Sequence, residues 1–269
     1  MEQKFREFTK TDVSIAVKDH YRKMRQNQTF DYVKRMHNKY LNFNNPMELW
    51  EAMYSLDNLI DVSDPDLDLP NVQHLIQSAE AIRNDNRPDW MQLTGLIHDL
   101  GKTMYLWGCD KDGTSQKEQW GLVGDVFVVG CSLPKSCVFP EFNKLNPDMK
   151  NEKYNTQNGI YQDKCGLDNL TLAWGHDEYL YQVLKNHKTN NLPEEAMAMI
   201  RYHSFYPWHT GMSYSSLLNE KDKEYLDWIK DFNKYDLYTK SNKTYDLDEI
   251  IDYYDPIAKK YLGNTLIYW

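Results

Sequence analysis

The adjacent residues His98 and Asp99 lie near the end of an apolar run, TGLIHDLGK, and constrain this 269-residue chain more than any other feature. Neighbouring side chains on a helix point about 100° apart, so His98 and Asp99 can face one buried point only if something small and positive draws them together. A carboxylate buried on an apolar helix without a partner is strongly unfavourable. The pair therefore predicts a metal ion or a dense hydrogen-bond network.

Further imidazoles and carboxylates occur at positions that should face inward. His74 lies among apolar residues of its own helix, and His203 and Asp236 follow apolar residues at helical spacing. The His-Asp dipeptide recurs at His176, which raises the set to four imidazoles and two carboxylates. This number of ligands suits two metal ions that share a bridging carboxylate. Imidazole and carboxylate ligands without thiolate suit iron, manganese or zinc. The other four histidines, which we assign to packing or to the surface, are His20, His37, His187 and His209.

Composition excludes several classes of protein. A net charge of −9 argues against a nucleic-acid partner, since binding phosphates normally needs a basic patch. The sequence has no run near the roughly 18 apolar residues of a membrane span, and its charged start lacks the apolar stretch of a signal peptide. Its four cysteines form no C-x-x-C pair, as in a reducing compartment. We therefore expect a cytoplasmic protein without membrane contact, a monomer with one catalytic domain over residues 1–269.

Apolar residues recur at the spacing of amphipathic helices over most of the chain. Pro88 and Pro193 stand at expected helix starts, and Gly101 is expected to end the helix that carries His98 and Asp99 in its last turn. Residues 103–165 are less regular, with one extended run at 121–131 that we expect in loops or a short β-hairpin. The predicted fold class is all-α, a helical bundle with long loops. The expected helices cover 12–40 as one or two helices, 46–60, 71–85, 88–101, 177–186, 193–204, 221–238 and 246–262.

The order of a histidine, a His-Asp pair and a distant aspartate resembles the HD-domain superfamily, in which these side chains hold a metal on a helical bundle. Longer segments resemble one family closely, the myo-inositol oxygenases. They keep the family's order across nearly the full chain: LDNLIDVSDPDLDLPNVQHLIQSAEAIR, WMQLTGLIHDLGK, QWGLVGDVFVVGC, LAWGHDEYLYQVLKN, MIRYHSFYPWHTG and DFNKYDLYTK. The visible departure from the family is the longer loop WGCDKDGTSQKEQW, which precedes Gly124.

The resemblance implies a non-haem di-iron oxygenase that works with a mixed-valent Fe(II)/Fe(III) pair. Its implied reaction is the O2-dependent ring cleavage of myo-inositol to D-glucuronate, a four-electron oxidation without an organic cofactor. Asp99 would bridge the two irons. The implied ligands of one iron are His74, His98, Asp99 and Asp236, and those of the other are Asp99, His176 and His203.

The resemblance also implies a polar substrate site around Lys102, which could donate a hydrogen bond to an alkoxide oxygen and stabilise its charge. The implied substrate contacts are Arg6, Asp61, Asp64, Lys102, Gly124, Asp125, His203, Ser204 and Lys240. Arg6 is remote from the others in sequence, so we expect residues 1–30 or so to fold back as a lid that excludes water. Deleting residues 1–10 should then weaken substrate binding without changing the iron content.

Two other classes of protein use similar ligands. An HD-type phosphohydrolase should gather several cations around its metals, and Lys102 and Lys240 are few for that task. A metal-storage protein usually carries Glu-x-x-His motifs on its bundle helices, and this chain has none. Activity on generic phosphate esters would favour the first class, and an iron content well above two per chain the second.

Overall fold

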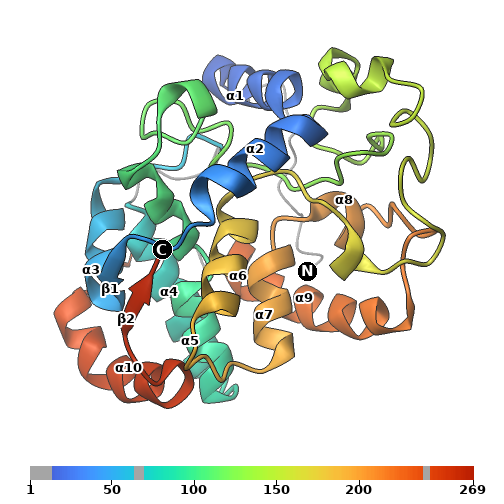
Figure 1. The fold of residues 1–269 in the computed structure, drawn as a ribbon. Coiled ribbons are helices and arrows are strands. Elements are labelled where there is room, and N and C mark those ends of the chain that lie inside the picture. The colour runs from blue at the N-terminus through green and yellow to red at the C-terminus, as the bar shows by residue number, and fades with distance from the viewer. Residues whose placement is uncertain (1–13, 64–69, 239–242) are drawn as a thin grey trace.

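The computed structural model describes residues 14–63, 70–238 and 243–269 and is mostly helical, which confirms the all-α fold class (Figure 1). Its α-helices are α1 (Ile15–Asn27), α2 (Phe30–Tyr40), α3 (Leu49–Ser55), α4 (Asn71–Asn84), α5 (Asp89–Ile97), α6 (His176–Asn186), α7 (Glu194–Tyr202), α8 (Tyr206–His209), α9 (Glu220–Tyr238) and α10 (Leu247–Leu262). Short 3-10 helices are η1 (Leu56–Asn58), η2 (Leu100–Leu106), η3 (Asp110–Asp112), η4 (Pro140–Leu145), η5 (Pro147–Lys150) and η6 (Leu167–Asn169). Among the described residues, every helix is too short or too polar to span a lipid bilayer.

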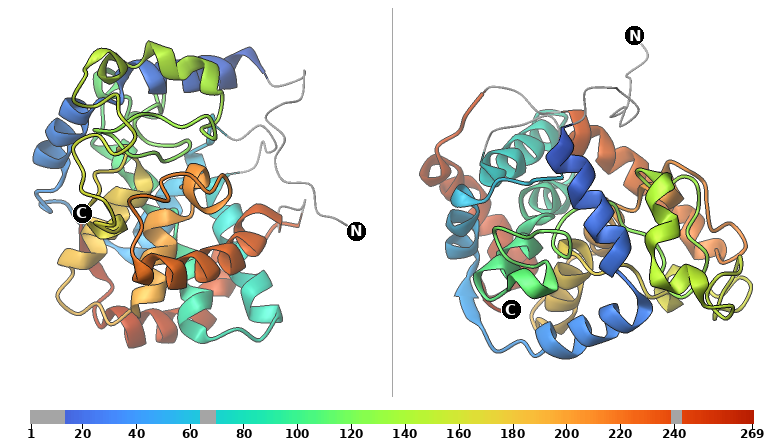
Figure 2. Two further views of the ribbon diagram at one scale, coloured as in Figure 1. Left: turned by 90° about the vertical axis from the view of Figure 1, so that its right-hand side faces the viewer. Right: turned by 90° about the horizontal axis from the view of Figure 1, so that it is seen from above.

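The segment expected as one or two helices at 12–40 forms two. The Ser14 side chain accepts a hydrogen bond from the Val17 amide at 3.2 Å, and the Thr29 side chain accepts one from the Tyr32 amide at 3.1 Å, so each residue caps a helix start. Helix α1 and the loop-rich segment 103–172 lie together on one side of the helical bundle (Figure 2).

Helices α4 and α5 pack closely at the centre of the bundle because Gly95 has no side chain. A Cβ atom on Gly95 would lie 2.6 Å from Ile82 Cδ1 and 3.2 Å from the Cα atom of Ala79. Helix α5 is buried from Met91 to Ile97. Because α7 and α9 contact α5, and α6 contacts α7, the helices that carry the candidate ligands surround one buried volume.

The helix expected at 88–101 ends earlier, at Ile97, so that prediction was wrong at its C-terminal boundary. His98 caps α5, and the chain continues as the 3-10 helix η2 from Leu100. Gly101 is not a left-handed helix cap. A Cβ atom there would lie 2.0 Å from the His176 carbonyl oxygen, so this glycine allows η2 to approach the start of α6.

Of the two structures expected for 121–131, loops or a short hairpin, the loops are confirmed and no hairpin forms within this run. This run forms one isolated bridge, between Val128 and Leu172. The two-stranded antiparallel sheet instead pairs β1 (Pro46–Glu48) with β2 (Leu266–Tyr268), and Met47 lies opposite Ile267. The helix expected at 46–60 therefore begins only at Leu49. A pairing between distant segments has no turn chemistry that a sequence could reveal.

Candidate metal centre

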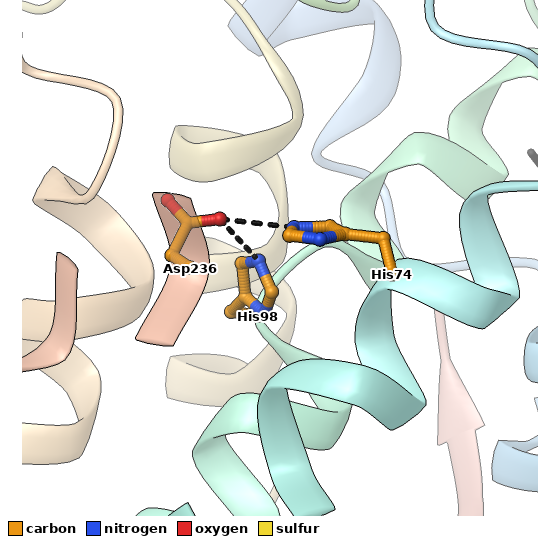
Figure 3. A group of neighbouring side chains, drawn as sticks. All are labelled: His74, His98 and Asp236. Carbon is orange, nitrogen blue, oxygen red and sulfur yellow. Dashed lines mark hydrogen bonds and ion pairs between the residues drawn. The ribbon is translucent and has the colours of Figure 1, made fainter. Parts of the chain in front are cut away.

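The first ligand group joins three helices at one carboxylate oxygen. His74 on α4 and His98 at the end of α5 direct their Nε2 atoms at Oδ1 of Asp236 on α9, at 2.9 and 3.4 Å (Figure 3). Asp99 Oδ2 lies 3.9 Å from the His74 nitrogen and 3.8 Å from the His98 nitrogen. These side chains could hold one metal ion between them.

The second group lies on the other side of Asp99. His176 is the first residue of α6 and His203 follows the last residue of α7, and their Nε2 atoms are 3.2 Å apart. Asp99 Oδ1 lies 3.0 Å from His176 Nε2 and 3.4 Å from His203 Nε2. Since Oδ2 faces the first group and Oδ1 the second, Asp99 has the geometry of a bridging carboxylate.

Three of the imidazoles are oriented by backbone carbonyl groups. The Nδ1 atoms donate to carbonyl oxygens as follows: His98 to Gly95 at 2.8 Å, His176 to Leu122 at 2.8 Å and His203 to Ile200 at 3.0 Å. A carbonyl oxygen can only accept, so Nδ1 carries the hydrogen and Nε2 of each neutral ring presents a lone pair. The Nε2 atoms of His176 and His203 face each other beside a carboxylate, an arrangement that a proton or a metal cation between them would stabilise. The residues present therefore fit a bound metal.

Asp177 is a further carboxylate at the second group, and its role was missed although its His-Asp dipeptide had been noted. Its Oδ1 lies 3.2 Å from His203 Nε2 and its Oδ2 lies 3.4 Å from His176 Nε2. The residue is 1% exposed, and neither oxygen has a hydrogen-bond partner among the described residues. Repetition of the His-Asp dipeptide was the sequence signal that could have identified it.

The electrostatics of the centre favour a bound cation. Burial alone would raise the pKa of Asp99, but the Lys102 ammonium and the neighbouring imidazoles hold it well below its usual range. Burial likewise opposes ionisation of Asp236, yet the hydrogen bond from His74 and the neighbouring His98 imidazole keep its pKa well below the ordinary value. Burial would lower the pKa of His203, but Asp177 and Asp99 raise it to about 9. Without metal the second group thus holds a proton that a metal ion would displace.

A polar pocket opens beside both groups, and Lys102 stands in it. The Lys102 ammonium donates to Asp99 Oδ2 and to Asp61 Oδ2, each at 2.8 Å. Burial would lower its pKa, but these two carboxylates raise it above the ordinary value. The lining residues are Tyr21, Asp61, Ser63, Asn71, His74, Asp99, Lys102, Gly124, His176, His203, Ser204, Tyr206 and Asp236. Of these, Tyr21, Ser63, Asn71 and Tyr206 were not predicted.

The structure does not bring the Asp125 carboxylate to this pocket. Asp125 is fully buried and accepts two hydrogen bonds from Arg25 Nη2, at 2.7 and 2.9 Å, and one from the Val138 amide at 2.9 Å. Its neighbour Gly124 lines the pocket. Of the two residues expected to contact substrate, only Gly124 is therefore placed to do so. Arg25 had no signal of its own in the sequence.

Three expected substrate contacts, Arg6, Asp64 and Lys240, lie outside the described residues. Part of the expected lid is described. Helix α1 lies against the pocket, where Tyr21 forms part of the lining and His20 Nε2 donates to the Val123 carbonyl oxygen at 3.1 Å. The lid function of residues 1–13 stays a prediction.

Comparison with known proteins decides the family. The sequence profile described as Myo-inositol oxygenase matches residues 14–269. The chain belongs to the myo-inositol oxygenase family. It is 44% identical to the inositol oxygenase of Danio rerio over 97% of this chain and 92% of that protein. It is 45% identical to inositol oxygenase 4 of Arabidopsis thaliana (98% and 82% covered) and 42% identical to the inositol oxygenase of Dictyostelium discoideum (98% and 89% covered). The resemblance to the myo-inositol oxygenases inferred from motifs is confirmed.

Proposed function

We propose that this chain is an inositol oxygenase that cleaves the ring of myo-inositol with O2, a four-electron oxidation that yields D-glucuronate. The observation that carries the proposal is the position of Asp99, whose two oxygens face two separate groups of imidazoles. A shared carboxylate between two histidine-rich groups suits a pair of metal ions rather than one. Family membership supports the same reaction.

The proposed cofactor is a pair of iron ions, mixed-valent when active. His74, His98, Asp99 and Asp236 would hold one iron, and His176, His203 and Asp99 the other. When bound, the pair would supply Lewis acidity toward substrate hydroxyl groups and an electron for O2. The buried imidazoles and carboxylates leave the pocket side open for substrate.

Lys102 would act directly on the substrate. Its ammonium is buried between Asp61 and Asp99, so it is both charged and fixed in direction. A donor held in this way stabilises negative charge on a substrate oxygen without having to reorganise. The side chains of Asp61 and Ser204 and the backbone of Gly124 would bind further hydroxyl groups of the polyol. The proposed contacts Arg6, Asp64 and Lys240, the monomeric state, the single catalytic domain and the cytoplasmic location stay predictions.

Electron paramagnetic resonance under anaerobic conditions tests the function. The chain is loaded with iron, partly oxidised and measured before and after addition of myo-inositol. We expect a mixed-valent signal that myo-inositol perturbs, and D-glucuronate on admission of O2. The Asp99→Asn variant should lose the coupled signal because a neutral amide bridges two cations poorly. A wild-type chain that retains zinc or manganese and gives no such signal would contradict the proposal.

A further inference from the structure

A buried ion pair joins α6 and α7 next to the second ligand group. Arg201 Nε donates to Glu178 Oε2 at 2.7 Å, and Arg201 Nη2 donates to Glu178 Oε1 at 3.4 Å. The two side chains are 6% and 3% exposed. In the described part of the chain, neither residue lines the pocket beside the ligands. The pair is therefore close to the centre in sequence without being able to contact a substrate there.

The ion pair joins α6 to α7 near the end of this helix pair that carries His176 and His203. Helix α6 leads away from the centre and α7 returns, with residues 187–193 between them, and the two helices lie side by side (Figure 1). His176 and His203 therefore stand at the open end of this helix pair, opposite the connecting loop. Helix ends open more readily than helix interiors. The two Nε2 atoms that meet at this end are 3.2 Å apart.

The spacing along each helix places the ion pair behind the ligands. Glu178 follows His176 by two residues, and Arg201 precedes His203 by two residues. Two residues correspond to about 200° around a helix, so the pair and the imidazoles occupy opposite faces. Arg201 is held further by the ring of Tyr181, 4.4 Å from the guanidinium carbon to the ring centroid. The pair can thus fix the separation of the helices while the imidazoles stay free for metal.

We propose that Glu178 and Arg201 are positioning residues that set the separation of His176 and His203 before the second iron binds. The inference rests on the proposed di-iron function. With the ion pair intact, the imidazoles are already placed for the metal. Without it, part of the binding free energy must draw the helix ends together, and the affinity falls. The first group, on α4, α5 and α9, should be insensitive to the change.

Anaerobic titration of the full chain with iron(II) tests the proposal, followed by electron paramagnetic resonance of the partly oxidised protein. The variants are Glu178→Gln and Arg201→Lys. The control is Tyr254→Phe, which removes a partly buried hydrogen bond of 2.9 Å from Tyr254 on α10 to Glu80 on α4. We expect the second iron to bind about 10- to 100-fold more weakly in the two test variants. The first iron should bind as in wild type, and the control should bind both irons normally.

Each outcome is decisive. If Glu178→Gln and Arg201→Lys bind both irons as tightly as the control does, the positioning role is wrong. Equal weakening of both irons would overturn it too, because that result indicates a general loss of structure. If circular dichroism shows that Glu178→Gln is unfolded, Arg201→Lys decides, since it keeps the buried charges balanced. A wild-type chain that binds fewer than two irons would overturn the proposed function and the positioning role together.

Discussion

Two ligands, His98 and His203, use the end of a helix in the same way. Each follows the last residue of its helix, and each Nδ1 atom donates to the carbonyl oxygen three residues earlier. The last carbonyl groups of a helix have no partner within the helix. One hydrogen bond therefore satisfies such a carbonyl and leaves Nε2 free for a metal. The position of a histidine at a helix end thus determines its tautomer as well as its location.

Replacement of Lys102 by methionine should separate substrate activation from metal binding. We expect kcat/KM for myo-inositol to fall about 100- to 1000-fold because a fixed donor to the reacting oxygen is lost. Iron content should not fall, since removing an ammonium beside Asp99 and Asp61 favours cations. Steady-state kinetics and metal analysis measure both. The control Lys23→Met removes a lysine paired with Glu118 at the surface and should leave kcat/KM unchanged. Loss of iron from Lys102→Met would contradict the assignment.

His209 gives a prediction about acid stability. Burial lowers its pKa from 6.5 to about 4, and its Nε2 donates to the His203 carbonyl oxygen at 2.9 Å. The pKa of His209 is lower in the folded state than in the unfolded state. Its contribution to the free energy of unfolding is therefore intact above pH 6.5 and is lost as the pH falls through 4. The loss amounts to about 3 kcal/mol.

Urea denaturation of wild type and His209→Gln, repeated between pH 7 and pH 4, measures this contribution. The free energy of unfolding of wild type should decrease more steeply with falling pH, so that the difference between the two proteins shifts by about 3 kcal/mol across the range. The shared carboxylates titrate equally in both and cancel in the difference. Parallel curves would show that His209 does not titrate in this way.

At the scale of elements, the centre depends on the contact between η2 and α6. Asp99 immediately precedes η2 and His176 begins α6, and Gly101 lies against the His176 backbone. We expect Gly101→Ala to lower the free energy of unfolding by about 1 to 3 kcal/mol, because a methyl group there must displace backbone. The displacement moves His176 relative to Asp99, so iron binding should weaken as well. Chemical denaturation and metal titration test both effects.

Gly175, the residue before His176 at the start of α6, offers a matched control. A Cβ atom there would meet its nearest neighbour, the Leu122 carbonyl oxygen, at 3.6 Å, and the residue has an extended backbone with φ of −172°. Gly175→Ala should therefore cost less than about 1 kcal/mol, mostly through its position before α6. If the two variants lose equal stability, the close approach of Gly101 is not the cause.

At the scale of the whole molecule, side chains from α4, α5, α6, α7 and α9 converge on the candidate metals. Buried carboxylates repel one another when no cation is present, so metal removal should loosen the bundle as a whole. At a metal concentration 100-fold above Kd, binding adds about 2.7 kcal/mol. Chelation should thus lower the Tm by about 5 to 10 °C, and iron(II) should restore it. An unchanged Tm in thermal denaturation would argue against a structural role for the metals.

Much of the fold and of the candidate site could be predicted from local patterns. Apolar periodicity located the helices around His74, His203 and Asp236 because burial of one helix face leaves a repeat in the sequence. The end of the helix at His98 was placed too late, since Gly101 signals a terminus but serves a contact with α6. The pairing of β1 with β2 could not be predicted from local sequence patterns, because the two strands are far apart in the chain.

The sequence by itself determined which side chains are available, where the helices form and, through long motifs, the family. Only the tertiary structure decided how those side chains are used. It turns the two oxygens of Asp99 to different groups, adds Asp177 to the second group and commits Asp125 to Arg25. The physical reason is that ligand geometry and ion pairing depend on distances of a few ångströms between residues far apart in the chain, and those distances exist only after the helices have packed.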